Sequence, residues 1–174
     1  VFVTDRISGG TGILEIEQDQ EEVDIDLLLR RLLIASERFV SLFGRDFEIC
    51  FYDEDLEALV NRERDIVEVL KAIAVDDHTN DDLFLQYQPI MDLKRDKIVG
   101  FEALARLKTE KLGLVSPLEF IPIAEKTKLI LPIGEKVIIK AFSFLNKLKE
   151  HGYDEIYISI NISVIQLLKP NFID

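Results

Sequence analysis

The chain has 174 residues, and 48% of them are hydrophobic, which is enough to build one domain of ordinary size or two small ones. Acidic residues outnumber basic ones by 33 to 21, and the net charge of -12 argues against a general affinity for nucleic acid or anionic membranes. No apolar stretch approaches the ~20 residues that span a bilayer, and the N-terminus has no signal-peptide pattern. We therefore expect a globular, cytoplasmic protein without a membrane segment.

Cysteine and histidine are too sparse for a disulfide or a zinc site. Cys50 is the single cysteine, so it has no partner for an internal disulfide. The histidines, His78 and His151, lie far apart in the sequence, with no Cys/His cluster around them. Zinc is therefore not an expected cofactor.

Glycines interrupt the short strand pattern of residues 1–16. The cluster consists of Gly9, Gly10 and Gly12, and neither a helix start nor a Lys-Ser/Thr pair follows it, as a phosphate-binding loop would require. A tight turn or a bulge is the simpler prediction.

A helix, a strand and a second helix are predicted next. Apolar residues recur over 28–42 at alternating steps of four and three, the period of one helix face, and Gly44 favours an end to that helix. Residues 47–52 alternate as a strand does. Acidic residues then open a helix over 53–74, which carries an apolar stripe.

A polar segment marks the predicted joint between domains. Residues 76–82 contain no apolar side chain to bury. We expect an N-terminal domain at 1–52, a connecting helix and joint at 53–82, and a second domain at 83–174.

The second domain begins with two strands, at 83–90 and 98–107, joined by a polar turn at 92–97. Two helices and a further strand at 156–161 follow. The order strand, helix, strand predicts an α/β fold with a parallel sheet or barrel.

The first of these helices has a strong start signal. Ser116 can cap it, Pro117 suits its first position, and Glu119 completes a capping box. The second helix is expected to open at Pro132 and to end at Gly152.

Polar residues occupy one face of two predicted strands. Alternation over 98–107 places Glu102 and Arg106 on the same face, although a strand buried on both sides should be apolar throughout. A solvated edge strand or a satisfied ion pair would also explain them. Asn161 ends the strand at 156–161, and at the C-terminal rim of a barrel it could meet Glu102 at one Mg²⁺ or Mn²⁺ ion.

Four segments in order resemble consecutive blocks of the EAL family. They are QYQPI at 86–90, GFEALAR at 100–106, SPLEFIPIAE at 116–125 and NISVIQL at 161–167. The resemblance covers 83–174, whereas a barrel of this type takes roughly 250 residues. We therefore expect the early strands and helices of a TIM-like barrel, incomplete and inactive alone.

The resemblance implies a role in bacterial cyclic di-GMP signalling, through metal-dependent hydrolysis of cyclic di-GMP to the linear dinucleotide. Glu102 matches the catalytic motif glutamate, a ligand of the metal, and Asn161 matches the asparagine that joins it. Gln88 and Arg106 match positions that contact the substrate, and Leu104 matches the residue that packs near the dinucleotide. Two Mg²⁺ or Mn²⁺ ions are expected only in the complete domain.

Residues 1–52 resemble, over fewer positions, the end of a GGDEF-type cyclase domain. A strand with glycines and a long helix precede the sequence GRD at 44–46 and a strand that ends with FYD at 51–53. The signature loop is absent, and the helix departs from the family's pattern. We therefore interpret this part as a degenerate remnant without cyclase activity.

Two other hypotheses stay open beside the phosphodiesterase. One is a degenerate EAL/GGDEF sensor or regulatory module that binds cyclic di-GMP or a partner without catalysis. The other is a structural role, with a homodimer formed through the 53–74 helix or through exposed barrel strands. Ser163 and Gln166 could steady Asn161, and a plain helix start at Ser163 is an equal alternative.

Overall fold

The computed structural model describes residues 9–16, 24–42, 47–75 and 81–170. The chain forms two compact units, Val1–Arg64 and Asp65–Asp174, and the division falls inside a helix. The predicted end of the first helix near Gly44 and most of the predicted joint, 76–80, lie outside the described residues.

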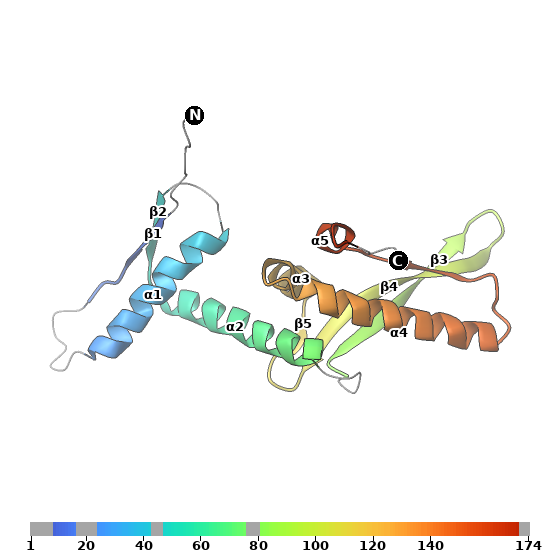
Figure 1. The fold of residues 1–174 in the computed structure, drawn as a ribbon, viewed down its shortest axis with the longest axis horizontal. Coiled ribbons are helices and arrows are strands. Elements are labelled where there is room, and N and C mark those ends of the chain that lie inside the picture. The colour runs from blue at the N-terminus through green and yellow to red at the C-terminus, as the bar shows by residue number, and fades with distance from the viewer. Residues whose placement is uncertain (1–8, 17–23, 43–46, 76–80, 171–174) are drawn as a thin grey trace, which may run out of the picture. The chain divides into compact units, whose positions relative to one another are not determined.

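The first unit is built on two strands and a helix (Figure 1). Strand β1 (Gly9–Ile13) pairs in parallel with β2 (Phe47–Phe51), and helix α1 (Ile25–Leu42) packs against both strands. Parallel neighbours need a crossover connection, and α1 supplies it.

The glycine cluster lies within β1, so the turn or bulge predicted there is wrong. A Cβ on Gly12 would lie 2.7 Å from the carbonyl oxygen of Leu32 and 2.9 Å from the Cβ of Ala35. Gly12 therefore allows the strand to approach α1 more closely than any side chain would permit.

Helix α2 (Glu54–Val75) agrees with the prediction for 53–74. The carboxylate of Asp53 accepts a hydrogen bond of 2.6 Å from the backbone N–H of Leu56, which satisfies one of the donors at the helix start. The part of α2 up to Arg64 belongs to the first unit, and the remainder belongs to the second.

The second unit is organised around a four-stranded sheet. Strand β4 (Lys97–Thr109) pairs antiparallel with β3 (Leu83–Asp92) and β5 (Gly113–Val115), and parallel with β6 (Tyr157–Ile160). The predicted α/β fold is confirmed. β5 has only three residues, too few to show alternation, and it was not predicted.

Three helices accompany the sheet. Helix α3 (Pro117–Lys126) starts as predicted, with Ser116 as its N-cap. Helix α4 (Ile130–Glu150) begins at Ile130 rather than at the predicted Pro132. The short helix α5 (Val164–Leu167) follows β6, with Ser163 as its N-cap.

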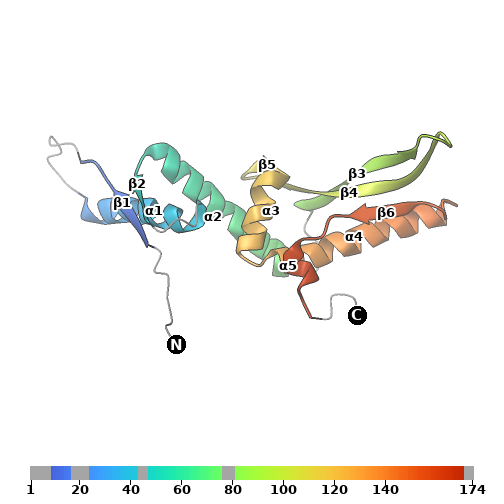
Figure 2. The same cartoon turned by 90° about the horizontal axis from the view of Figure 1, so that it is seen from above.

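Helix α4 covers one face of the sheet (Figures 1 and 2). The ring of Phe144 stacks on Tyr87 at 3.7 Å between centroids and meets Phe101 edge-on at 5.7 Å. Because successive strand residues point to opposite faces, the neighbours of these aromatic residues, Gln88 and Glu102, point away from α4.

A continuous apolar core lies between the sheet and the helices. Fully burying one such side chain contributes roughly 1.5–3 kcal/mol, so this core dominates the stability of the second unit. Its largest fully buried members are Phe120, Ile66, Leu70, Ile73, Leu83, Leu107, Ile133 and Val115.

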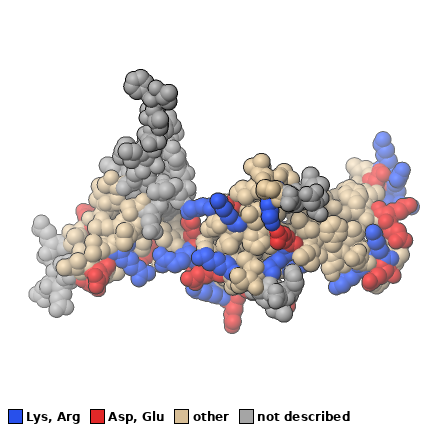
Figure 3. Space-filling model, in the orientation of Figure 1, with Lys and Arg blue, Asp and Glu red and all other residues tan. Residues whose placement is uncertain are grey.

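Charges of both signs are interspersed on the visible face of the second unit, and they gather over the β3–β4 turn (Figure 3). This turn carries Lys94, Arg95 and Asp96, and Lys97 begins β4 directly after it. None of the helices in the described ranges is long and apolar enough to cross a bilayer.

The partly buried hydroxyl of Tyr87 leads us to expect a loss of stability at high pH. Burial raises the pKa of Tyr87 above its ordinary value of 10.0. The folded chain therefore holds this proton more tightly than the unfolded chain, and the resulting stability is lost as the pH rises through the folded pKa. From pH ~10 upward, the unfolding temperature measured by circular dichroism should fall more steeply for the wild type than for Tyr87→Phe. Equal slopes would refute this prediction.

Candidate functional site

Two predicted metal ligands meet where β4 and β6 run side by side. Glu102 lies in β4 opposite Ser159 of β6, and Asn161 directly follows β6 on the same face. The side-chain Nδ2 of Asn161 donates a hydrogen bond of 2.7 Å to Oε1 of Glu102. The structure therefore brings together a carboxylate and an amide that are 59 residues apart in the chain.

The donor set of this pair fits a hard cation in part. Carboxylate and amide oxygens are the ligands that Mg²⁺ and Mn²⁺ prefer, and the hydrogen bond occupies the amide nitrogen of Asn161 rather than its oxygen. Within the described ranges, no group of three or more His, Cys, Asp or Glu side chains could hold an ion. Glu102 and Asn161 thus offer two protein ligands, and water, substrate or further residues must complete the coordination.

Gln88 lies directly opposite Glu102 in the antiparallel β3–β4 pair and is exposed. Side chains in directly opposed positions have Cβ atoms only about 5 Å apart, so the Gln88 amide can reach a molecule bound at Glu102. Gly100, on the same face, is covered by Tyr157, since a Cβ there would lie 2.8 Å from the Tyr157 ring. The sequence prediction missed this aromatic neighbour of the site.

Arg106 lies farther along the same face than Glu102. Four strand residues separate their Cα atoms by about 13 Å, so the guanidinium and the carboxylate occupy different places along this face. Its Nε donates to Oε1 of Gln86 at 2.8 Å, and one terminal nitrogen donates to the Ala105 carbonyl at 2.9 Å. A guanidinium has five N–H donors, so these two contacts orient it and leave donors for an anion.

A cavity of about 320 Å³ lies next to these side chains. Leu104 and Arg106 line it from β4, and Asn161 lines it from the end of β6. Phe120 of α3 and Ile133 of α4 belong to its apolar wall. Three of the predicted site residues therefore share one cavity, while Gln88 and Glu102 are not part of its lining.

The helix start at Ser163 is confirmed, and it includes a tertiary contact. Ser163 caps α5, and the side chain of Gln166 bonds back to the backbone N–H of Ser163 at 3.1 Å. The Ser163 hydroxyl also donates to Oε1 of Glu125 on α3 at 2.6 Å. Glu125 lies within a predicted family block, but nothing in the local sequence indicates this partner.

The second unit is thus a mixed α/β fold in which the carboxylate of Glu102 lies within β4, and the amide of Asn161 directly follows the end of the parallel strand β6. The EAL domain family model matches residues 68–174, so the chain belongs to the EAL domain family. The match begins within α2 and includes every predicted site residue.

The chain is also similar in sequence to named proteins. The biofilm architecture maintenance protein MbaA of Vibrio cholerae is 38% identical over 120 residues, which are 69% of this chain and 15% of that protein. The probable cyclic di-GMP phosphodiesterase PdeI of Escherichia coli is 38% identical over 93 residues, which are 52% of this chain and 12% of that protein. The chain thus spans a small part of the length of these relatives.

A solved structure supports the same fold. The PaMucR phosphodiesterase, in complex with c-di-GMP, superposes with a TM-score of 0.54 at 30% sequence identity. The similarity covers 67% of this chain and 43% of that one.

Proposed function

We propose that this chain supplies part of the metal and substrate site of a cyclic di-GMP phosphodiesterase, which hydrolyses cyclic di-GMP to the linear dinucleotide. The observation that carries the proposal is the hydrogen bond of 2.7 Å between Asn161 and Glu102. It joins the two predicted metal ligands across neighbouring parallel strands in a chain of the EAL family. One matched relative is named a probable cyclic di-GMP phosphodiesterase.

Glu102 and Asn161 would hold Mg²⁺ or Mn²⁺. Such an ion, when bound, activates a water molecule and stabilises the charge that develops on the phosphodiester. The contribution of Asn161 is twofold, since its Nδ2 fixes one oxygen of Glu102 while its own oxygen stays available as a ligand. The pair is therefore oriented before a ligand arrives.

Arg106, Gln88 and Leu104 would bind the dinucleotide. The remaining N–H donors of Arg106 suit phosphate oxygens. The guanidinium also supplies the local positive charge that an anionic ligand needs on a chain of net charge -12. The amide of Gln88, opposite Glu102, can hydrogen-bond to the substrate near the metal. Leu104 offers an apolar contact in the cavity.

The complete protein, incubated with cyclic di-GMP and Mn²⁺, is expected to release the linear dinucleotide, as followed by chromatography. EDTA should abolish the product, and added Mn²⁺ should restore it. The 174-residue chain alone should yield no measurable product, because its described residues offer two metal ligands rather than a full set. Folded complete protein that gives no product with either Mg²⁺ or Mn²⁺ would end the proposal.

A second candidate is a sensor or regulatory module that binds cyclic di-GMP without cleaving it. Arg106 and Leu104, which line the cavity, would contact the dinucleotide without a metal ion. Titration calorimetry in EDTA and in Mg²⁺ separates the two functions. Tight binding in both, without turnover, would identify the sensor.

The remaining predictions concern the rest of the chain. The β1–α1–β2 arrangement is compatible with a GGDEF-like remnant at 1–52, and this origin, the domain limits and the cytoplasmic location stay proposals. Much of the apolar stripe of α2 is buried within the chain's own units, including Leu56 and Leu70. A homodimer through α2 would instead use exposed side chains such as Leu59.

A further inference from the structure

A partly buried anchor holds the turn that follows Asn161. The Ser163 hydroxyl donates to Oε1 of Glu125 at 2.6 Å and accepts from the backbone N–H of Ile165 at 3.3 Å. Both roles of the hydroxyl are thus in use. The bond to Glu125 is short because its acceptor is a carboxylate, the kind of hydrogen bond that is roughly twice as strong as a neutral one.

Gln166 completes this anchor from α5. Only 4% of its surface is exposed, and its Oε1 accepts from the backbone N–H of Ser163 at 3.1 Å. It lies so close to Gly134 of α4 that a Cβ there would be 1.9 Å from its Nε2. Gln166, seated on α4, therefore holds the backbone of Ser163, and Glu125 of α3 holds its hydroxyl, within the wall of the candidate cavity.

Asn161 lies just before this anchor in the chain. It is exposed, and a hydrogen bond between solvent-accessible groups adds little net stability because water competes for both partners. Ser163 is two residues from Asn161 in the chain. The position of the Ser163 backbone therefore constrains the position of the Asn161 Cα, from which the side chain extends.

We propose that Glu125 and Ser163 are positioning residues, which hold Asn161 against Glu102 and so shape the metal site. The catalytic consequence rests on the proposed function, whereas the geometry does not. The apolar core already joins α3 to α4 through Phe120 and Ile133. Loss of the Glu125 contact should therefore loosen the turn without unfolding the second unit.

Nuclear magnetic resonance of the ¹⁵N-labelled 174-residue chain tests the geometry directly. The Asn161 side-chain amide is assigned as the signal lost in Asn161→Asp. In the wild type we expect two well-separated amide protons and a positive heteronuclear Overhauser effect. In Glu125→Ala and Ser163→Ala both features should shift to the values of a free, mobile amide. Glu125→Gln and Ser163→Thr keep an acceptor or a hydroxyl and should recover most of the wild-type signature.

Glu135→Ala is the matched control. Glu135 accepts from Lys169 Nζ at 2.8 Å, so it also ties the α5 region to a helix, but through exposed side chains and without touching Ser163. It should leave the Asn161 signals in place. Unchanged signals in folded Glu125→Ala, or equal changes in Glu135→Ala, overturn the proposal. If Glu125→Ala does not fold, the comparison of Ser163→Ala with Ser163→Thr tests whether the anchor positions Asn161.

The consequence for activity is measured separately in the complete protein. Glu125→Ala should raise the Mn²⁺ concentration for half-maximal hydrolysis by about tenfold, in the range seen when a partner that orients a metal ligand is removed. The KM for cyclic di-GMP should change much less. A complete wild-type protein without activity would refute the proposed function but would not affect the conclusion from the resonance experiment. An active enzyme with unaltered Asn161 signals in Glu125→Ala would remove only the positioning role.

Discussion

Glu102→Gln in the complete protein is expected to lower the rate of cyclic di-GMP hydrolysis by about 100-fold or more, a loss typical of removing one preorganised electrostatic group from an active site. The substitution keeps the size of the side chain and an oxygen that can accept from Nδ2 of Asn161. It removes the negative charge that a divalent cation requires. The effect therefore reports on metal binding rather than on packing.

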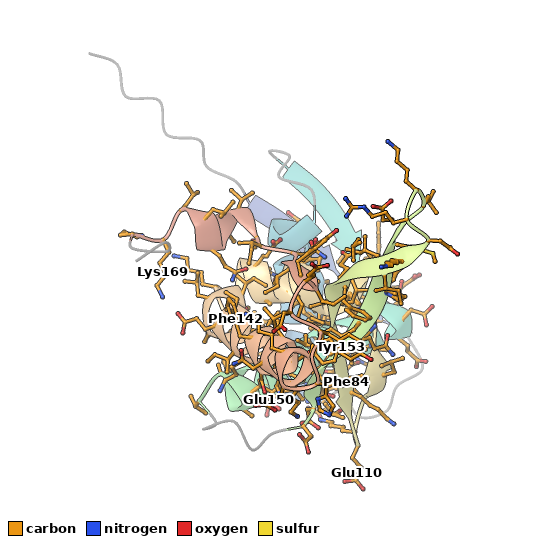
Figure 4. The ribbon with its side chains drawn as sticks, turned by 90° about the vertical axis from the view of Figure 1, so that its right-hand side faces the viewer. Phe84, Glu110, Phe142, Glu150, Tyr153 and Lys169 are labelled. Carbon is orange, nitrogen blue, oxygen red and sulfur yellow. The ribbon has the colours of Figure 1, made fainter. Side chains whose placement is uncertain are left out.

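The measurement compares hydrolysis over a range of Mn²⁺ concentrations in the variant and in Glu110→Gln. Glu110 is an exposed carboxylate in the turn between β4 and β5 (Figure 4), so this control changes the net charge equally at a distance from the site. Glu110→Gln should retain full activity. A wild-type rate of hydrolysis in Glu102→Gln would show that Glu102 is not a metal ligand.

Gly134→Ala is expected to destabilise the chain by about 1–3 kcal/mol, the usual cost of overpacking a well-packed site. In an ordinary helix interior the same substitution would stabilise by up to about 1 kcal/mol, because alanine forms helices better than glycine. Here the new Cβ would lie 1.9 Å from Nε2 and 2.7 Å from Cδ of Gln166. Gln166 is buried, so it cannot move away without breaking its bond to the backbone of Ser163.

Urea unfolding followed by circular dichroism measures this cost, and Gly100→Ala is its control. A Cβ on Gly100 would lie 2.8 Å from the Tyr157 ring, but that ring is 49% exposed and can swing into solvent. Gly100→Ala should therefore cost clearly less. The double variant Gly134→Ala, Gln166→Ala should recover part of the loss. A Gly134→Ala chain as stable as the wild type would show that Gln166 relocates freely.

Local sequence pattern was sufficient for most elements of the second unit. The capping residues Ser116 and Ser163 start their helices because a side-chain oxygen satisfies N–H groups only a few residues away. Alternation in β4 correctly placed Glu102 and Arg106 on one face. The turn or bulge predicted at Gly9, Gly10 and Gly12 was wrong because all three lie in β1, and Gly12 allows a close approach to α1.

In the candidate site, too, some residues could be predicted from the sequence and others could not. Glu102 and Asn161 could be proposed as partners from motif matches and strand order, because the ends of parallel strands meet on one edge. The residues that support them could not be predicted from the sequence. Gln86, which orients Arg106, and Tyr157, which covers Gly100, have no local pattern that distinguishes them from ordinary strand residues.

Residue order alone thus decided the family, the α/β class and the identity of the side chains that face one another along β4. Tertiary packing decided how those side chains are held. Glu125 and Ser163 are 38 residues apart, and they meet only because α3, α4 and α5 share the core beside β4 and β6. A hydrogen bond of this kind depends on the packing of several apolar surfaces at once, so no periodicity or spacing within one segment contains it.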